Sequence, residues 1–131
     1  MTRRLENVMV IDDEEVDQML YRRILTRSGL VENIIPFLYA DEALDYLRNG
    51  ERPAIDVIFL DINIPRMNGF EFLDAAMNEI GPCFADAVVV MITTSLNPRD
   101  EERAAQYDVV KKFINKPLTI DHVNGVAELV A

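Results

Sequence analysis

The stretch VIFLD, residues 57–61, places the carboxylate of Asp61 directly after four consecutive apolar residues. A run without polar alternation is typical of a strand that is buried on both faces, as in a parallel sheet. A carboxylate at the end of such a run has no structural purpose, because burying an unpaired charge costs free energy. We therefore interpret Asp61 as a functional residue at the carboxyl end of a strand.

Two further apolar runs end in charged residues in the same way. Residues 8–11, VMVI, precede Asp12 and Asp13, and residues 112–115, KFIN, precede Lys116-Pro117. Separations of roughly 50 residues leave room for the helical crossovers that parallel strands need. Because the carboxyl ends of parallel strands meet at one edge of the sheet, we expect the three carboxylates and the ammonium of Lys116 to converge there.

This convergence predicts a divalent-metal site, because carboxylates a few Å apart raise each other's pKa strongly unless a cation lies between them. Oxygen ligands of this kind suit Mg²⁺. Thr93 and Thr94 end another apolar run at the same predicted edge, where a hydroxyl can donate to an oxyanion. A carboxylate nucleophile, acids for magnesium, a hydroxyl and an ammonium are the groups that phosphoryl transfer to an aspartate requires.

Strand-like runs alternate with helical patterns along the whole chain. The expected strands are residues 8–11, 34–38, 55–60, 87–92 and 112–114. The apolar stripes of the expected helices are Val16, Met19, Leu20 and Ile24; Ala43, Leu44 and Leu47; Phe70, Leu73, Ala76, Met77 and Ile80; and Ile120, Val123, Val126 and Val130, with a fourth helix expected to begin at Asn97-Pro98. We expect these stripes, with their Met and Phe residues, to face the core. The alternation predicts an α/β fold, a three-layer doubly wound sandwich with a five-stranded parallel sheet and five helices.

Composition restricts the classes of function. The 131 residues include 13 basic and 23 acidic side chains, for a formal charge of −10, which argues against binding to nucleic acid or anionic lipid. No segment has the length of a membrane span, so we expect a cytoplasmic protein. Cys83 is the only cysteine, which excludes an intramolecular disulfide. We expect one domain over residues 1–131, with no separate output domain.

The motif DINIPRMNG, residues 61–69, together with the acid pair, Thr93 and Lys116-Pro117, resembles the receiver domain of two-component response regulators. The resemblance covers essentially the whole chain, and the stand-alone form resembles chemotaxis-type or phytochrome-associated single-domain regulators. It implies a flavodoxin-like topology in which the five strands of the sheet have the order 2-1-3-4-5. It implies that Asp61 accepts the phosphoryl group and that Mg²⁺ is the cofactor. The implied magnesium ligands are Asp13 and Asp61 directly, Asp12 through water, and the backbone carbonyl of Asn63.

The resemblance also implies roles in signalling. Thr93 matches the family's switch hydroxyl, Lys116 its ammonium, and Phe113 the aromatic residue that changes rotamer on phosphorylation. Thr94 stands where the family often has alanine, a departure that would narrow access to the phosphoryl group and slow its hydrolysis. Asn68 stands where aspartate is common, and we expect no consequence.

These assignments lead us to expect a response regulator that takes its phosphoryl group from a histidine kinase or a histidine phosphotransfer protein. It would assist its own phosphotransfer and autodephosphorylation without being an enzyme for a separate substrate. Output would pass to a downstream protein partner, or to a homodimer, through the fourth helix, fifth strand and fifth helix. That face carries Arg99, Arg103, Tyr107, Lys111 and Lys112.

Two alternatives stay open at this point. A small haloacid-dehalogenase-like phosphatase also uses an aspartyl phosphate, but it expects its nucleophile after the first strand in an Asp-x-Asp motif, where this chain has adjacent acids. A phosphorylation-independent adaptor with an inactive pocket is the second alternative, and the complete set of acids argues against it.

Overall fold

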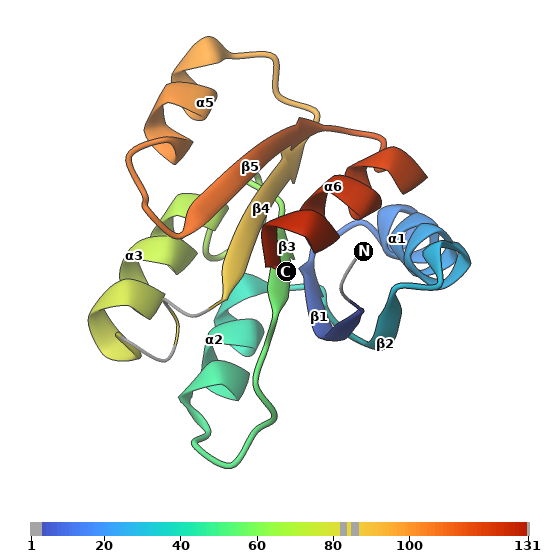
Figure 1. The fold of residues 1–131 in the computed structure, drawn as a ribbon. Helices are drawn as coiled ribbons and strands as arrows, with labels where there is room; N and C mark the ends of the chain where they lie inside the picture. The colour runs from blue at the N-terminus through green and yellow to red at the C-terminus, as the bar shows by residue number, and fades with distance from the viewer. Residues whose placement is uncertain (1–3, 82–83, 85–86, 131) are drawn as a thin grey trace.

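The fold was analysed in a computed structural model, which describes residues 4–81, 84 and 87–130. Cys83 lies outside the described residues. Five parallel strands form one sheet in the order β2-β1-β3-β4-β5, as predicted (Figure 1). The strands are β1 (Leu5–Ile11), β2 (Val31–Phe37), β3 (Val57–Leu60), β4 (Val88–Thr93) and β5 (Val110–Asn115). The expected fold class is therefore confirmed.

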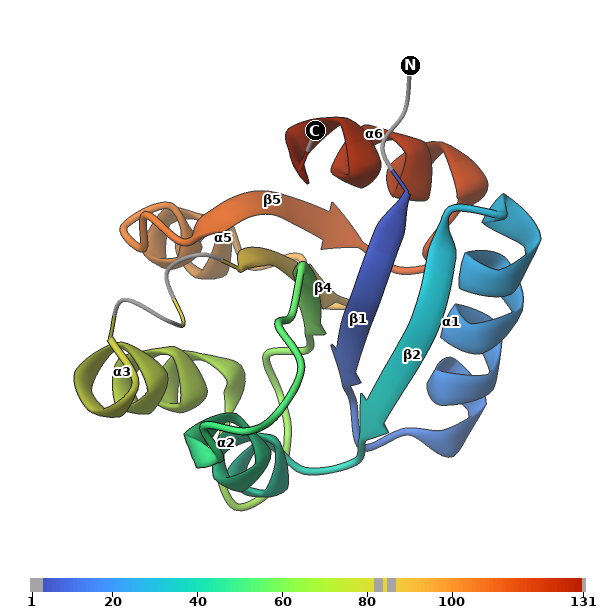
Figure 2. The same cartoon turned by 60° about the horizontal axis from the view of Figure 1, so that its bottom comes forward.

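Five helices of the described residues cover the two faces of this sheet. They are α1 (Glu15–Ser28), α2 (Ala40–Arg48), α3 (Gly69–Glu79), α5 (Pro98–Ala104) and α6 (Ile120–Val130). Figures 1 and 2 show α1 and α6 on one face and α2, α3 and α5 on the other. The fourth and fifth helices expected from the sequence correspond to α5 and α6. Among the described residues, none of the helices combines the length and the apolar composition that crossing a membrane requires.

Alternate residues of the central strands feed two separate core layers. Ile58 and Leu60 pack into the layer under α2, α3 and α5, whereas Val57 and Phe59 pack into the layer under α1 and α6. All four side chains are fully buried. Burial on both faces is the reason why the run at residues 57–60 shows no polar alternation.

The apolar stripe predicted for the first helix is wrong for three of its four residues, whereas the fourth, Ile24, is partly buried against the core. Val16 and Met19 are each 67% exposed and Leu20 is 42% exposed, while Tyr21 and Leu25 form the buried side of α1. The helix is rotated in this way because its sheet-facing side, near its N-terminus, carries polar side chains that bond to the ends of the strands. Met77, also expected in the core, is 39% exposed on α3.

The loop between β3 and α3 is held close to the end of β3. The backbone N–H of Gly69 donates to the carbonyl of Ile62 at 2.8 Å, and a Cβ on Gly69 would lie 2.6 Å from the carbonyl oxygen of Asp61. Only glycine fits this close approach. Asn68 begins α3 with a capping box, in which its side chain accepts from the N–H of Glu71 and the Glu71 side chain accepts from the N–H of Asn68. This fixed loop holds Asp61 in place.

Candidate functional site

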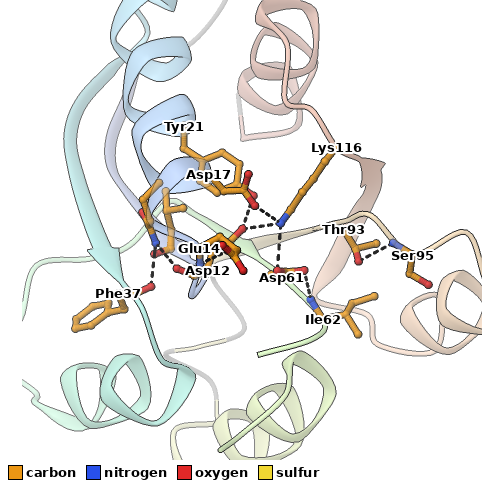
Figure 3. A network of polar contacts seen from close by, with 12 residues as sticks. Asp12, Glu14, Asp17, Tyr21, Phe37, Asp61, Ile62, Thr93, Ser95 and Lys116 are labelled. Carbon is orange, nitrogen blue, oxygen red and sulfur yellow. Dashed lines mark hydrogen bonds and ion pairs between the residues drawn. The ribbon is translucent and has the colours of Figure 1, made fainter. Parts of the chain in front are cut away.

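Three charged side chains meet at the carboxyl edge of the sheet, where the sequence predicted them. Asp12 follows the last residue of β1, Asp61 follows the last residue of β3, and Lys116 follows the last residue of β5. Figure 3 shows the three side chains turned toward one another. The Lys116 Nζ lies 2.8 Å from Asp12 Oδ2 and 3.2 Å from Asp61 Oδ2. The predicted convergence of acids and ammonium is confirmed.

Asp12 is completely buried, and its carboxylate is engaged on both oxygens. The backbone N–H of Glu14 donates to Oδ1 at 2.9 Å, and both the Tyr21 hydroxyl and Lys116 donate to Oδ2 at 2.8 Å. Burial, together with the adjacent charge of Asp12, raises the pKa of the Tyr21 hydroxyl, so that it stays a protonated donor. Asp12 is thus held in one orientation by three donors.

Asp61 is 6% exposed, and burial followed by repulsion from Asp12 raises the pKa of its carboxyl group. Two donors oppose this effect: Lys116 on Oδ2 and the backbone N–H of Ile62, which lies 2.8 Å from Oδ1. The result is a largely desolvated carboxyl group with a hydrogen-bond donor on each of its oxygens. Such a group is a suitable nucleophile for a phosphorus centre, because little water must be removed from it before reaction.

Lys116 carries the positive charge of the site and donates to a third carboxylate as well. Asp17 Oδ2 in the first turn of α1 lies 2.8 Å from Nζ. Burial alone would lower the pKa of this ammonium, but the hydrogen bonds to Asp12 and Asp17, together with the charges of Asp61 and Asp12, outweigh burial and the pKa is raised. Lys116 is therefore a permanent cation. The Lys116-Pro117 peptide bond is cis.

The donor set fits a magnesium ion. One carboxylate oxygen from each of Asp12, Asp13 and Asp61 lies within 4.8 Å of the others, and hard oxygen donors at this spacing are those that Mg²⁺ takes. Asp13 is half-buried, and among the described residues no hydrogen bond or ion pair engages its carboxylate. Its oxygens are free for direct ligation, whereas those of Asp12 are already occupied. Both oxygens of Asp61, an implied direct ligand, also accept hydrogen bonds, so the division of ligand roles among the three acids stays a prediction.

The other predicted residues lie around this centre. Thr93, the last residue of β4, is completely buried, and its Oγ1 accepts from the backbone N–H of Ser95 at 3.1 Å (Figure 3). Thr94 is exposed and lines a hollow of about 220 Å³ with Lys116 and Leu20. Asn63 is an exposed residue of the loop after β3, and its role as a carbonyl ligand stays a prediction.

Phe113 lies on the same face of the sheet as Thr93. The register pairs Met91 with Phe113 and Thr93 with Asn115, and side chains two residues apart on a strand share a face. Phe113 is half-buried and lines a second hollow, of about 190 Å³, between α5 and β5. A route from Thr93 to Phe113 thus has an open space at its end, although the switch itself stays a prediction.

Helix α1 supplies three polar side chains that our sequence analysis missed. Asp17 bonds to Lys116, and Tyr21 bonds to Asp12. Gln18 Nε2 donates to the carbonyls of Asp12 and Phe37 at 2.9 and 3.0 Å, which ties α1 to the ends of β1 and β2. A signal was present, because residues 17, 18 and 21 have the spacing of one helical face just after the acid pair.

The chain belongs to the response regulator receiver domain family, whose model matches residues 8–127. A two-component response regulator from Cytophaga hutchinsonii has the same fold, with a TM-score of 0.87, 29% identity and coverage of 98% of both chains. The bacteriophytochrome response regulator RtBRR is similar at a TM-score of 0.78 and 25% identity, covering 97% of this chain and 78% of the other. The predicted resemblance is confirmed, and the family assignment displaces the dehalogenase-like alternative.

Among curated proteins, the probable methanogenesis regulatory protein FilR2 of Methanothrix harundinacea is 26% identical over 124 residues, covering 92% of this chain and 78% of the relative. Other relatives are much longer, and the chain spans only 18% to 31% of the length of three of them. The likeness to those proteins therefore concerns one part of each.

The free carboxylate of Asp13 leads to a prediction about metal binding. Mg²⁺ should raise the melting temperature by several degrees, since a ligand at 100 times its dissociation constant stabilises the fold by about 2.7 kcal/mol. Asp13→Ala should reduce this response, whereas Asp108→Ala, which removes an exposed acid before β5, should leave it unchanged. Calorimetric melting with EDTA and with a Mg²⁺ series measures both. Equal Mg²⁺ responses in wild type and Asp13→Ala would show that Asp13 is not a ligand.

Proposed function

We propose that this chain is a response regulator that accepts a phosphoryl group on Asp61 from a histidine kinase or a histidine phosphotransfer protein. The observation that carries the proposal is the contact of Lys116 Nζ with both Asp12 and Asp61 beside a cluster of three carboxylates. Membership of the receiver family supports the same role. The acids alone would be compatible with a simple cation site. The Lys116 ammonium adds, beside a bound cation, a second positive group that a phosphoryl oxygen can reach.

In the proposed reaction, an oxygen of Asp61 attacks the phosphorus atom of a phosphohistidine whose other ring nitrogen is protonated. The new O–P bond forms as the P–N bond breaks, and the electron pair leaves on nitrogen to give neutral imidazole. Lys116 and the hydroxyl of Thr93 donate to phosphoryl oxygens, and the raised pKa of Lys116 keeps its charge throughout. Magnesium held by Asp13 and Asp61, with Asp12 through water and the Asn63 carbonyl, neutralises charge on those oxygens when it is bound.

The exposed apolar side of α1 offers a place for the phosphodonor to dock. Val16, Met19 and Leu20 lie on this side, and Leu20 also lines the hollow that reaches Lys116 and Thr94. Apolar side chains of this size on a helix in water are typical of a protein interface. A helical donor that covers this surface would bring its phosphohistidine to the hollow, where Thr94 limits the space around the phosphoryl group and slows attack by water.

Output is proposed to pass from Thr93 to Phe113 and from there to a downstream protein, or to a second copy of the chain, at α5, β5 and α6. Two side chains of this region are already engaged: the Arg103 guanidinium stacks 4.2 Å from the Phe70 ring, and the Tyr107 hydroxyl donates to Asp74 at 2.8 Å. Both contacts join α5 and the loop after it to α3. We therefore expect phosphorylation to change the surface formed by Lys111, Lys112 and the hollow beside Phe113.

Domain organisation, cellular location and the lack of a separate substrate belong to the same proposal. The chain acts as one receiver domain over residues 1–131 in the cytoplasm, and it assists its own phosphorylation and dephosphorylation without converting a separate substrate. Binding to nucleic acid or to a membrane is not part of the proposal, because the formal charge is −10. The alternative function is that of a phosphorylation-independent adaptor, and labelling with acetyl phosphate distinguishes the two.

Phosphorylation should occur on Asp61 alone. Incubation with acetyl phosphate and Mg²⁺, followed by mass spectrometry of the intact protein and its peptides, should find one added phosphoryl group on Asp61. Asp61→Asn should abolish the label and keep the wild-type circular dichroism spectrum. Labelling of Asp61→Asn at the wild-type level would place the acceptor elsewhere, and a wild-type protein without any label would favour the adaptor.

The switch should depend on the hydroxyl of Thr93. Beryllofluoride with Mg²⁺ should shift amide resonances both at the site and around Phe113 in the wild type, because a two-state coupling of about 1–3 kcal/mol moves a pre-existing equilibrium. In Thr93→Ala the shifts should stay near Asp61, and Thr93→Ser should restore the distant ones. Distant shifts of wild-type size in Thr93→Ala would refute the route.

A further inference from the structure

The ammonium of Lys116 donates to three carboxylates. One of them, Asp17, does not belong to the cluster of Asp12, Asp13 and Asp61. Asp17 Oδ2 lies 2.8 Å from Nζ, as close as Asp12 and closer than Asp61 at 3.2 Å. Figure 3 shows Asp17 reaching Lys116 from α1, on the side opposite to Thr93. Asp17 is held at this point by its helix, since the neighbouring Gln18 fixes α1 to the ends of β1 and β2.

An ammonium group has three N–H donors, and these three contacts use all of them. A phosphoryl group on Asp61 needs at least one of these donors and would draw Nζ toward β3 and β4. Asp12 is immobile, because it is buried and held by two further donors. Asp17 holds Nζ on the α1 side by a contact that, at 2.8 Å, is as short as the contact with Asp12.

Charge adds to this effect. Asp17 places a fourth carboxylate beside a site that already holds three acids, and its negative charge offsets the charge that Lys116 presents to an incoming phosphoryl group. The Asp17 side chain is 26% exposed and that of Lys116 is 10% exposed, so water screens the pair only in part. Asp17 also lines the hollow through which a donor reaches Lys116.

We propose that Asp17 is a positioning residue that holds Lys116 toward α1 and thereby slows phosphoryl transfer to Asp61. The inference rests on the proposed function and adds a rate-setting residue to it. With acetyl phosphate as donor, an oxygen of Asp61 forms the new O–P bond, the P–O bond to the acetyl group breaks, and acetate leaves with the electron pair without any proton transfer. Lys116 must turn toward the phosphoryl oxygens in this step, and releasing it from Asp17 makes the turn easier.

The test compares three variants at a Mg²⁺ concentration that saturates each of them. Asp17→Asn keeps the size of the side chain and removes its charge. Glu15→Gln removes the same charge from the same turn of α1 at an exposed position where the structure shows no contact with Lys116, and so controls for the net charge of the helix. Asp17→Glu keeps the charge and should restore the restraint. Melting curves confirm that each variant is folded.

The expected result is a maximal rate of Asp61 labelling by acetyl phosphate that is about threefold to tenfold higher in Asp17→Asn than in wild type, from the loss of one partly screened ion pair to the reacting ammonium. The concentration of acetyl phosphate at half-maximal rate should change less than the maximal rate. Glu15→Gln and Asp17→Glu should stay within about twofold of wild type. In addition, the ¹⁵Nζ resonance of Lys116 should move in Asp17→Asn and keep its position in Glu15→Gln, which a general loss of stability would not produce.

Equal or slower labelling of Asp17→Asn, with the wild type labelled on Asp61, would overturn this inference and leave the proposed function in place. The same holds if Glu15→Gln accelerates labelling as much as Asp17→Asn does, since the effect would then come from net charge. A wild-type protein that takes no label on Asp61 would overturn both.

Discussion

The Lys116 ammonium contacts two carboxylates at the strand ends, Asp12 at 2.8 Å and Asp61 at 3.2 Å. Asp12 and Asp61 are both buried, and without a cation their mutual repulsion would force one of them to take up a proton. Lys116 prevents this from the end of β5, which lies at the edge of the sheet two strands from β3. The order of the strands lets one ammonium serve both acids.

Helix α1 has an inner side of mixed polarity and, near its N-terminus, an apolar outer side. Its inner side carries Gln18 and Tyr21, which bond to the strand ends and to Asp12, and Tyr21, Ile24 and Leu25 pack into the core layer under α1 and α6. Its outer side carries the apolar residues Val16 and Met19. Placing polar groups inside and apolar groups outside costs stability, and proteins accept such costs at functional sites.

The fold could be predicted from the sequence because β1, β3 and β4 are continuous apolar runs, which are typical of parallel strands buried on both faces. Asp12, Asp61 and Lys116 could be predicted because each is a charged residue directly after a strand. The face of α1 could not be predicted, because its apolar residues have helical spacing and periodicity does not say whether a stripe meets the core or a partner. Asp17 was missed since an acid in a first helical turn is ordinarily explained by the helix dipole, and only the three-dimensional structure brings it to Lys116.

The most direct test of this account is the free energy of unfolding of Lys116→Met at neutral pH, measured with EDTA and with saturating Mg²⁺. The variant should lose about 3 kcal/mol in EDTA, since removing one partner leaves buried charges uncompensated, and Mg²⁺ should recover most of the loss. Lys111→Met, which removes an exposed ammonium, should change little in either condition. If Lys116→Met were as stable as wild type in EDTA, Lys116 would not be the counterion that holds the acids together.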